Sequence, residues 1–583
     1  MINFKPLIFF IDDLLSQLEN IITQGRSEGF RRDFYISFEY YEHKNIFKHP
    51  IDICKNIYLH IINSQNFISR ELKLDKNHIK YDFSEKKFIV SDFESGIILD
   101  SKLLKKFNFM FVNGLIKNQL SIHKETHLKD EYYDKSLHFL GCHFDNHVLI
   151  SMINIKNNFI FDHVLFKQYV YVHSVKTNQN STFLFKNCTI NTINMQNNTF
   201  LSDVKFLLNT RISNLELTEN SFDGILSVQD SIVKNINLYK NELKNKCYFN
   251  YTCFGDKDHE ESKINLFNAK FQNDIYFDNS IFYNYADFHA CEFKKIASFY
   301  GVKFEKTPNF SQAIFKGNLN VVNTNLNFTF CDLQEKIIQE YEDFNKDKKE
   351  EYQKSLDKFA NDFRDSFRTF KNALIKDNNL LEASNFHKYE LYCKELELKF
   401  KKPKIFSREW IDKWQLFFYR KLCDHHTDIL QSLNSLILVI GIFVLSSVVM
   451  VVCFNYRLGY KPILEHWYFS LDFYNHHINS IIQDNYLFVV KVNFAMLFGY
   501  LILVGFALCL KYMREFFIII SYAITLSVLV VSPKILIPAM GFFTDKRAML
   551  DPLSTIGGIY TIVFGFVVFS FIKTIRKNSI VPS

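Results

Sequence analysis

Closely spaced cysteine pairs are absent from this sequence. The 11 cysteines are scattered over 583 residues, their number is odd, and no CxxC motif occurs. The pattern therefore indicates neither a zinc knuckle nor a disulfide framework. Free and mostly buried thiols are typical of a reducing compartment.

Dense charge of one sign and recognisable catalytic motifs are also missing. The formal net charge is only +7, and no dense basic run precedes Lys401, so charge gives no support for nucleic-acid binding. No Walker loop, GxGxxG, GxSxG, HExxH or EF-hand loop occurs. We therefore predict that the chain is not an enzyme, and we expect no cofactor and no metal site.

Glycine (17) and proline (9) are scarce, whereas phenylalanine is abundant with 64 copies. Between residues 266 and 326, large apolar residues recur at alternating steps of five and six. The series is Leu266, Phe271, Phe277, Phe282, Phe288, Phe293, Phe299, Phe304, Phe310, Phe315, Val321 and Leu326. The residues two places before these are mostly small, for example Ala269, Ser280, Ala286, Cys291 and Ala297.

Such steps are too short for helix–loop units, but they fit short strands that close a coil. Residues two apart on a strand point to the same side, so the large and the small residue both face inward. Four faces then make a coil of about 22 residues, and stacked coils lie about 4.8 Å apart. The phenylalanine rings are predicted to stack in the core.

The same alternation extends backward with lower fidelity as far as Phe139. Arg211 occupies one of the expected apolar positions, and the positions between Leu238 and Phe254 follow one residue out of phase. We interpret the segment 255–263 (GDKDHEESK) as a loop inserted between coils. A β-helix of roughly nine coils is predicted over residues 137–332.

The run FHACEFKKIASFYGVKFEKTPNFSQAIF (residues 288–315) is similar to the Phe-centred, degenerate branch of the pentapeptide-repeat proteins. This resemblance implies a right-handed quadrilateral β-helix and carries little information about function. Family members that mimic DNA use a strongly acidic rod. Residues 131–332 contain 20 acidic and 19 basic residues, so that activity is not supported here.

The regions beside the repeat have patterns of their own. Residues 1–136 are predicted to form an α/β cap, with an amphipathic helix from Leu7 to Ile22 and strands over 80–99. Residues 333–424 are predicted to form a helical hairpin and an interfacial linker that contains Trp410 and Trp414. The run FRTFKNALIKDNNLLEASNFHKYELY (367–392) resembles the helical hairpin that follows the repeats in many membrane-bound pentapeptide-repeat proteins. The matching residues are Arg368, Lys371, Leu374, Asn379, Glu382, Ala383, Phe386 and Glu390.

Residues 425–583 are predicted to form a transmembrane domain. Apolar stretches cover about 433–454, 489–510, 516–540 and 556–573. The first and last are nearly free of charge and long enough for a bilayer core of about 30 Å. Four spans is our count, with three as the alternative, because the third stretch is interrupted by Pro533. The complete fold prediction is therefore a β-helix with an α/β cap, a hairpin linker and a bundle of about four transmembrane helices.

Basic residues indicate how this domain is oriented. They are concentrated before the first span, between spans two and three and after span four. By the positive-inside rule, the soluble part and the C-terminus face the cytoplasm. Asp12 and Asp13 interrupt the apolar N-terminal run, so no signal peptide is expected. We predict a multi-pass protein of the bacterial inner (plasma) membrane.

Polar residues in and around the spans are the candidate sites. Lys491 and Asn493 could line a polar pathway in span two, although an interfacial lysine that snorkels is the preferred interpretation. The pairs His425-His426 and His476-His477 lack neighbouring ligands at metal-binding spacing, so loop histidines are preferred to a metal site.

Three functions follow from these patterns. The first is an integral membrane protein that displays a cytoplasmic β-helical scaffold for an unknown protein partner. The second is an ion channel or small transporter gated by the soluble domain. An enzyme that uses the histidine pairs is the third and weakest. Small residues in the spans permit a homo-oligomer without requiring one.

Overall fold

The computed structural model describes residues 50–82, 84–123, 132–259, 261–346, 353–457, 469–531 and 551–576. The chain consists of two compact units, Met1–Lys336 and Ile337–Ser583. The predicted amphipathic helix Leu7–Ile22 lies outside the described residues.

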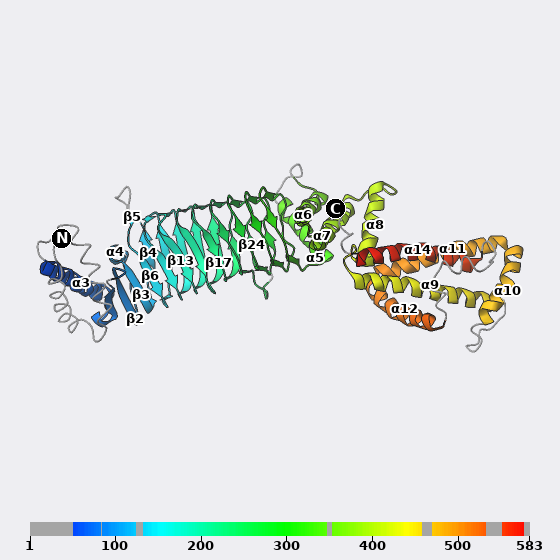
Figure 1. Cartoon of the computed structure of the whole chain (residues 1–583), viewed down its shortest axis with the longest axis horizontal. Helices are drawn as coiled ribbons and strands as arrows, with labels where there is room; N and C mark the ends of the chain where they lie inside the picture. Colours follow the sequence, from blue (N-terminus) through cyan, green and yellow to red (C-terminus); the bar gives the residue numbers. More distant parts are fainter. Residues whose placement is uncertain are drawn as a thin grey trace, which may run out of the picture. The chain divides into compact units, whose positions relative to one another are not determined.

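The first unit is a β-solenoid, in which short strands stack in parallel rows from coil to coil (Figure 1). One row forms a separate nine-stranded sheet: β5 (Tyr132–Tyr133), β9 (Asn154–Ile155), β12 (Lys176–Thr177), β15 (Thr199–Phe200), β18 (Ser221–Phe222), β21 (Glu242–Leu243), β25 (Lys270–Phe271), β29 (Glu292–Phe293) and β32 (Ile314–Phe315).

A second row runs along the whole solenoid. It contains β2 (Lys87–Ile97), β3 (Phe109–Ile116), β6 (Leu137–Leu140), β10 (Phe159–Asp162), β13 (Thr182–Lys186), β16 (Asp203–Leu207), β19 (Leu226–Val228), β22 (Cys247–Tyr248), β26 (Ile275–Tyr276), β30 (Ala297–Ser298) and β33 (Leu319–Asn320).

The remaining two faces share long strands in the middle of the solenoid and have separate strands towards its ends. The shared strands are β11 (Leu165–His173), β14 (Thr189–Gln196), β17 (Arg211–Thr218) and β20 (Ile232–Asn237). The separate strands are β4 (Leu120–His123), β7 (His143–Phe144), β8 (Val148–Ser151), β23 (Cys253–Phe254), β24 (Ile264–Asn265), β27 (Ile281–Phe282), β28 (Ala286–Asp287), β31 (Lys303–Phe304) and β34 (Asn325–Leu326). These rows confirm the predicted solenoid fold, with about 10 turns.

Strand register shows the predicted coil length. Leu137 pairs with Phe159 and Ala297 with Leu319, a spacing of 22 residues in both cases. Cys247 pairs with Ile275, so this coil is longer, and it contains the segment 255–263 that the sequence marks as an inserted loop.

One predicted core position is wrong. Arg211 is exposed, and the neighbouring Ile212 is buried in its place. The sequence pattern predicts a step of five residues after Phe206, the same as the step from Phe185 to Ile190. Phe185 pairs with Phe206 and Ile190 with Ile212, at spacings of 21 and 22 residues, so the step is six residues here and the inward position moves from 211 to 212.

Stacked phenylalanine rings fill the C-terminal half of the solenoid. Phe271, Phe277, Phe282, Phe288, Phe293, Phe299 and Phe304 are almost fully buried. Rings one coil apart are parallel, with centroids 4.5 Å apart for Phe288–Phe310 and 4.7 Å for Phe293–Phe315. The small residues Ala269, Ser280, Ala286, Cys291 and Ala297 are also buried, so each strand places a large and a small side chain inside.

An asparagine ladder supports the middle of the solenoid. Asn198, Asn220 and Asn241 occupy equivalent positions in successive coils and are buried. The Nδ2 of Asn198 donates to Asn220 Oδ1 at 2.9 Å, and the Nδ2 of Asn220 donates to Asn241 Oδ1 at 3.0 Å. The same amides donate to backbone carbonyls, so buried polar groups at the turns are satisfied.

The N-terminal end of the solenoid carries α3 (Pro50–Leu72), η1 (Lys76–His78), β1 (Ile79–Asp82) and α4 (Ser101–Leu104). β1 pairs with β2 in antiparallel fashion, whereas β2 and β3 already pair in parallel. Parallel stacking thus begins before residue 137, the boundary expected from the sequence. The antiparallel β1 covers part of the strand edge of β2, as an end cap should.

Helix α5 (Phe330–Asn345) begins directly after the last coil. Leu333 in its first turn is fully buried, and the Nζ of Lys336 lies 3.5 Å from the ring centroid of Tyr285. The start of α5 therefore packs on the C-terminal coils.

The second unit is helical. It contains α6 (Leu356–Lys376), α7 (Leu380–Lys401), α8 (Arg408–Cys423), α9 (Ile429–Arg457), α10 (Phe469–Asp484), α11 (Tyr486–Cys509), α12 (Lys511–Val531) and α14 (Pro552–Ile575). Three helices in the described part, α9, α11 and α14, are long and apolar enough to cross a membrane. The predicted third span (516–540) overlaps α12, but residues 532–550 lie outside the described part, so the count of four stays a prediction.

Candidate functional site

Helices α6 and α7 form the hairpin that the sequence predicts. The stripe Phe359, Phe363, Phe367, Phe370 and Leu374 on α6 is buried. Asn379 caps α7, because its side chain accepts a hydrogen bond from the backbone N–H of Glu382. The hairpin closes through Asn378, which has a left-handed φ of 57°.

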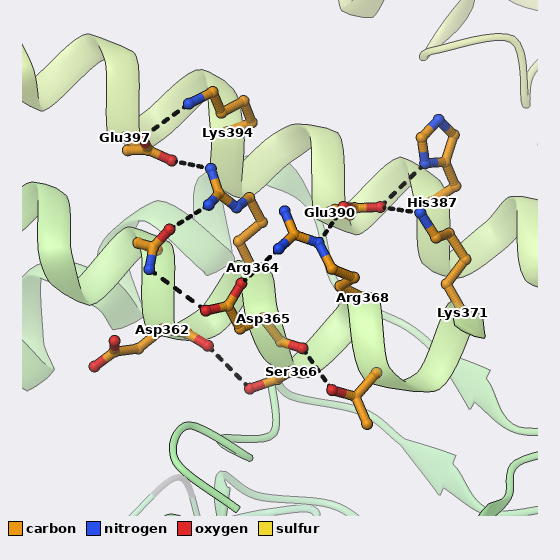
Figure 2. A network of polar contacts seen from close by, with 12 residues as sticks. Asp362, Arg364, Asp365, Ser366, Arg368, Lys371, His387, Glu390, Lys394 and Glu397 are labelled. Carbon is orange, nitrogen blue, oxygen red and sulfur yellow. Dashed lines mark hydrogen bonds and ion pairs between the residues drawn. The ribbon is translucent and has the colours of Figure 1, made fainter. Parts of the chain in front are cut away.

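Glu390 of α7 lies at the centre of a polar cluster (Figure 2). Its Oε1 accepts a bond from Arg368 Nε at 3.0 Å, and its Oε2 accepts one from Lys371 Nζ at 2.7 Å. His387 Nδ1 lies 3.2 Å from the same Oε2. Arg368 and Lys371 come from α6, so the buried carboxylate links the two helices.

A second carboxylate repeats this arrangement two turns further along α7. Glu397 forms ion pairs with Arg364 of α6 and with Lys394, the latter at 2.8 Å (Figure 2). Asp365 on α6 accepts a bond from Arg368 at 3.1 Å and one from Asn361 at 3.5 Å, and Asn361 accepts a bond from Arg364, which connects the two clusters.

Electrostatics keep Glu390 ionised. Burial acts to raise the pKa of its carboxyl group, but hydrogen bonds from His387, Lys371 and Arg368 outweigh burial and lower the pKa to about 2. The cluster is therefore a charged clamp between α6 and α7 throughout the neutral range.

The hairpin also contacts the segment that leads into the apolar helices. Glu395 accepts two bonds from the guanidinium of Arg420 on α8, both at 2.8 Å. Tyr392 donates to the carboxylate of Asp424, and Lys388 forms an ion pair with Asp424 at 3.4 Å. Bidentate arginine–carboxylate geometry fixes orientation as well as distance, so α7 and α8 are firmly coupled.

The turn from α8 to α9 has an unusual backbone. Asp424, His425 and His426 are consecutive residues with positive φ values of 47°, 55° and 70°. Left-handed conformations cost energy for residues other than glycine, so surrounding contacts must hold this turn. His426 Nδ1 lies 3.3 Å from the carbonyl oxygen of Ser570 in α14 and 3.3 Å from Cys423 Sγ.

The histidines at this turn are buried neutral rings. Burial lowers the pKa of His425 well below its usual value, and burial lowers the pKa of His426 to about 4. Among the described residues, no group of three or more His, Cys, Asp or Glu side chains could hold a metal ion. His476 and His477 lie on α10.

The candidate polar site in the second predicted span is split by the structure. Lys491 is exposed on α11, whereas Asn493 is buried in the bundle. Residues two apart on a helix point to different sides, so the two do not face one cavity together. Polar contacts between helices lie elsewhere, between α12 and α9. The guanidinium of Arg514 donates a hydrogen bond to Ser435 Oγ at 3.2 Å, and the Tyr522 hydroxyl donates one to Asn434 Oδ1 at 2.9 Å.

Sequence reasoning singled out Arg368, Lys371 and Glu390 through the hairpin resemblance, and the structure brings these three together. It missed Arg364, Glu397, Arg420 and Asp424. Helical spacing could have predicted Arg364 and Glu397. Arg364 lies one turn from Arg368 on α6, and Glu397 lies two turns from Glu390 on α7, so each pair is on one face of its helix.

Comparison with known proteins supports the interpretation of the solenoid. A family model described as "Pentapeptide repeats (9 copies)" matches residues 277–325, which lie in the coils with the most regular phenylalanine stacks. Residues 277–325 are therefore pentapeptide repeats.

The pentapeptide-repeat model covers only part of the solenoid, although parallel pairing continues to β2 at the other end. The N-terminal coils also stack phenylalanine rings, such as Phe139 on Phe161 and Phe161 on Phe185, and they have Ile, Val or Leu at other inward positions. No curated protein and no solved structure matched the chain.

Proposed function

We propose that this chain is an integral membrane protein that displays its solenoid as a binding surface for another protein. The apolar helices supply the anchor, and the ion-paired hairpin couples the soluble part of the second unit to that anchor. In this proposal the solenoid faces the cytoplasm, which the basic residues at the ends of the spans support.

Rows of partly exposed aromatic side chains on the solenoid are the observation that carries this proposal. Tyr248 and Tyr276 stack one coil apart, with ring centroids 5.4 Å from one another. Tyr239, Phe267 and His289 form a second row, with centroid distances of 4.7 and 5.2 Å. Aromatic residues are enriched in protein interfaces, and stacked rings present a rigid surface at low entropy cost.

A photocrosslinking experiment in native membranes tests the proposal. A photoreactive amino acid replaces Tyr276 in the full chain, and a matched variant carries it at Lys270, an exposed position on the nine-stranded sheet. We expect one discrete crosslinked protein from position 276, and its loss when Tyr248 is changed to Ser in addition. Equal diffuse crosslinking from both positions would refute a specific binding row.

A channel or small transporter gated by the soluble part is the second candidate. It is favoured by Asn455 and Asn493, which are buried within the apolar helices α9 and α11. Flux of monovalent ions into proteoliposomes is the test. Asn493→Leu should change this flux if the residue lines a pathway, and absence of flux in the unmodified protein would exclude the channel.

A further inference from the structure

Helix α8 has an aromatic and aliphatic face that is partly exposed in the described part of the chain. At about 100° per residue, Trp410, Ile411, Trp414, Phe417 and Phe418 fall within an arc of about 120°. Ile411 is 54% exposed and Trp414 and Phe418 are each 41% exposed. The rings pack against one another, with Trp410–Trp414 centroids 6.1 Å apart and Trp414–Phe417 centroids 5.7 Å apart.

The opposite face of α8 is occupied. Arg420 on that side forms the bidentate pair with Glu395 of α7, and the ring of Tyr419 lies 5.1 Å from that of His426. The hairpin therefore covers one side of α8 and leaves the aromatic side open.

The position of α8 relative to the apolar helices indicates what its aromatic side faces. The C-terminal end of α8 contacts three of these helices. Lys421 Nζ donates a hydrogen bond to Cys509 O at the end of α11, and Gln431 at the start of α9 donates one to Arg420 O. His426, in the turn after α8, contacts Ser570 O near the end of α14. Figure 1 shows α8 running across the end of the bundle, at a steep angle to α9 and α14. A helix in this position lies along the membrane surface if the bundle spans the membrane.

Basic residues flank the aromatic arc. Arg408 and Lys413 lie at its two sides on α8, and Lys402 and Lys404 stand in the segment just before the helix. Lys402, Lys404 and Arg408 are exposed. None of these four forms an ion pair with a carboxylate in the part of the chain that the structure describes. The preceding loop adds Ile405 and Phe406, which are 72% and 83% exposed.

We propose that α8 and its preceding loop, residues 402–418, form a binding surface for anionic phospholipids. Aromatic and aliphatic side chains enter the boundary between headgroups and acyl chains, and the four basic residues bind the phosphate groups beside them. Basic side chains near an anionic surface are attracted to it, so these four residues favour anionic over zwitterionic lipid. This surface is separate from the solenoid, so it does not depend on a protein partner.

Tryptophan quenching by brominated lipids tests the proposal on the full chain. The sequence has three tryptophans, and a Trp467→Phe variant leaves Trp410 and Trp414 as reporters. The protein is reconstituted into phosphatidylcholine vesicles with about 30 mol% phosphatidylglycerol, and only one lipid class is brominated at a time. We expect brominated phosphatidylglycerol to quench about twofold more than its mole fraction predicts, and less so at high salt.

Two variants separate headgroup selection from simple insertion. Replacing Lys402, Lys404, Arg408 and Lys413 with Gln should reduce quenching by brominated phosphatidylglycerol to its mole fraction, while total quenching persists. Replacing Lys176, Lys263, Lys294 and Lys295 of the solenoid with Gln makes the same change in net charge and should leave the selection intact. Size-exclusion chromatography checks that both variants are folded.

Two outcomes would overturn the proposal. Absence of quenching by either lipid would mean that the aromatic face does not reach the lipid, as when a second copy of the chain covers it. If the protein with its four basic residues intact is quenched by each lipid only in proportion to the mole fraction of that lipid, the helix inserts without selecting anionic lipid. Neither outcome bears on the binding role proposed for the solenoid, because the vesicles contain no partner protein.

Discussion

Individual side chains of the solenoid are interchangeable only within narrow limits. The inward positions accept Phe, Ile, Val or Leu at the large site and Ala, Ser, Cys or Val at the small one, because stacked coils leave a fixed cross-section. Burial away from water raises the pKa of the Cys142 and Cys188 thiols to about 12. The asparagine ladder is the exception to this apolar rule.

Replacing Asn220 with Ala should destabilise the solenoid. The change removes the acceptor that serves both the backbone N–H and the amide of Asn198, and it leaves the buried carbonyl of Met195 without its donor. Each unsatisfied buried group costs about 1–3 kcal/mol. Thermal unfolding monitored by the β-sheet circular dichroism signal should show a lower midpoint for Asn220→Ala. Asn191→Ala is the control, since Asn191 is exposed, and an equal shift in both variants would contradict the role of the ladder.

At the scale of elements, the hairpin and the apolar bundle are held together in different ways. The hairpin combines an aromatic seam with buried ion pairs, whereas α9, α11 and α14 pack mostly through apolar side chains, such as the stacked rings of Phe443 and Tyr560. Buried ion pairs fix the register of the two hairpin helices, because a misaligned hairpin would leave charges without partners.

Glu390 should make the stability of the hairpin depend on acid pH. Its folded pKa of about 2 lies below the unfolded value of 4.5, so the stabilisation is present above pH 4.5 and is lost as pH falls towards 2. Helical circular dichroism during thermal unfolding should show a midpoint that decreases over this window. In Glu390→Gln the midpoint should already be lower at neutral pH, by the equivalent of about 1–3 kcal/mol.

Glu335→Gln is the control for this experiment, because Glu335 is an exposed carboxylate on α5. It should retain the acid-dependent decrease. A similar decrease in Glu390→Gln would show that other carboxylates cause it.

Gly441 should be essential for the contact between α9 and α12. A Cβ atom at this position would lie 2.2 Å from the Oγ and 2.6 Å from the Cα of Ser521, so the helices could not approach as closely. Overpacking of this kind costs about 1–3 kcal/mol. Gly441→Ala should lower the thermal stability of the detergent-solubilised protein. Gly499→Ala should not, because nothing lies within 4 Å of its added Cβ.

At the scale of the whole molecule, the number of spans decides on which side the C-terminus lies. With four spans, the solenoid and the C-terminus face the same side, and with three they face opposite sides. Cys331 on α5 is exposed and reports on the soluble part. In a chain carrying Ser583→Cys and Cys453→Ser, a membrane-impermeant maleimide should label both reporters in inverted vesicles and neither in right-side-out vesicles. Labelling of the two reporters from opposite sides would show three spans.

The sequence by itself determined the repeating parts of this protein. A period of five and six residues with Phe at most inward positions specifies stacked coils, because every coil repeats the same local geometry. The apolar helices α9, α11 and α14 were readable for a similar reason, since an apolar run of sufficient length is a local property. The hairpin followed from apolar spacing at three and four residues.

Only the tertiary structure decided which side chains meet across the helices. The contact between Glu390 and Arg368 joins residues 22 apart in the sequence and depends on how the hairpin closes. The contact between Tyr392 and Asp424 joins residues 32 apart and depends on how α8 packs on α7. The shift of the core position from Arg211 to Ile212 has a similar origin, since it depends on how many residues each face of the coil contains. Likewise, the aromatic residues of α8 are visible in the sequence, but packing of its other face on the hairpin leaves Trp414 and Phe418 exposed.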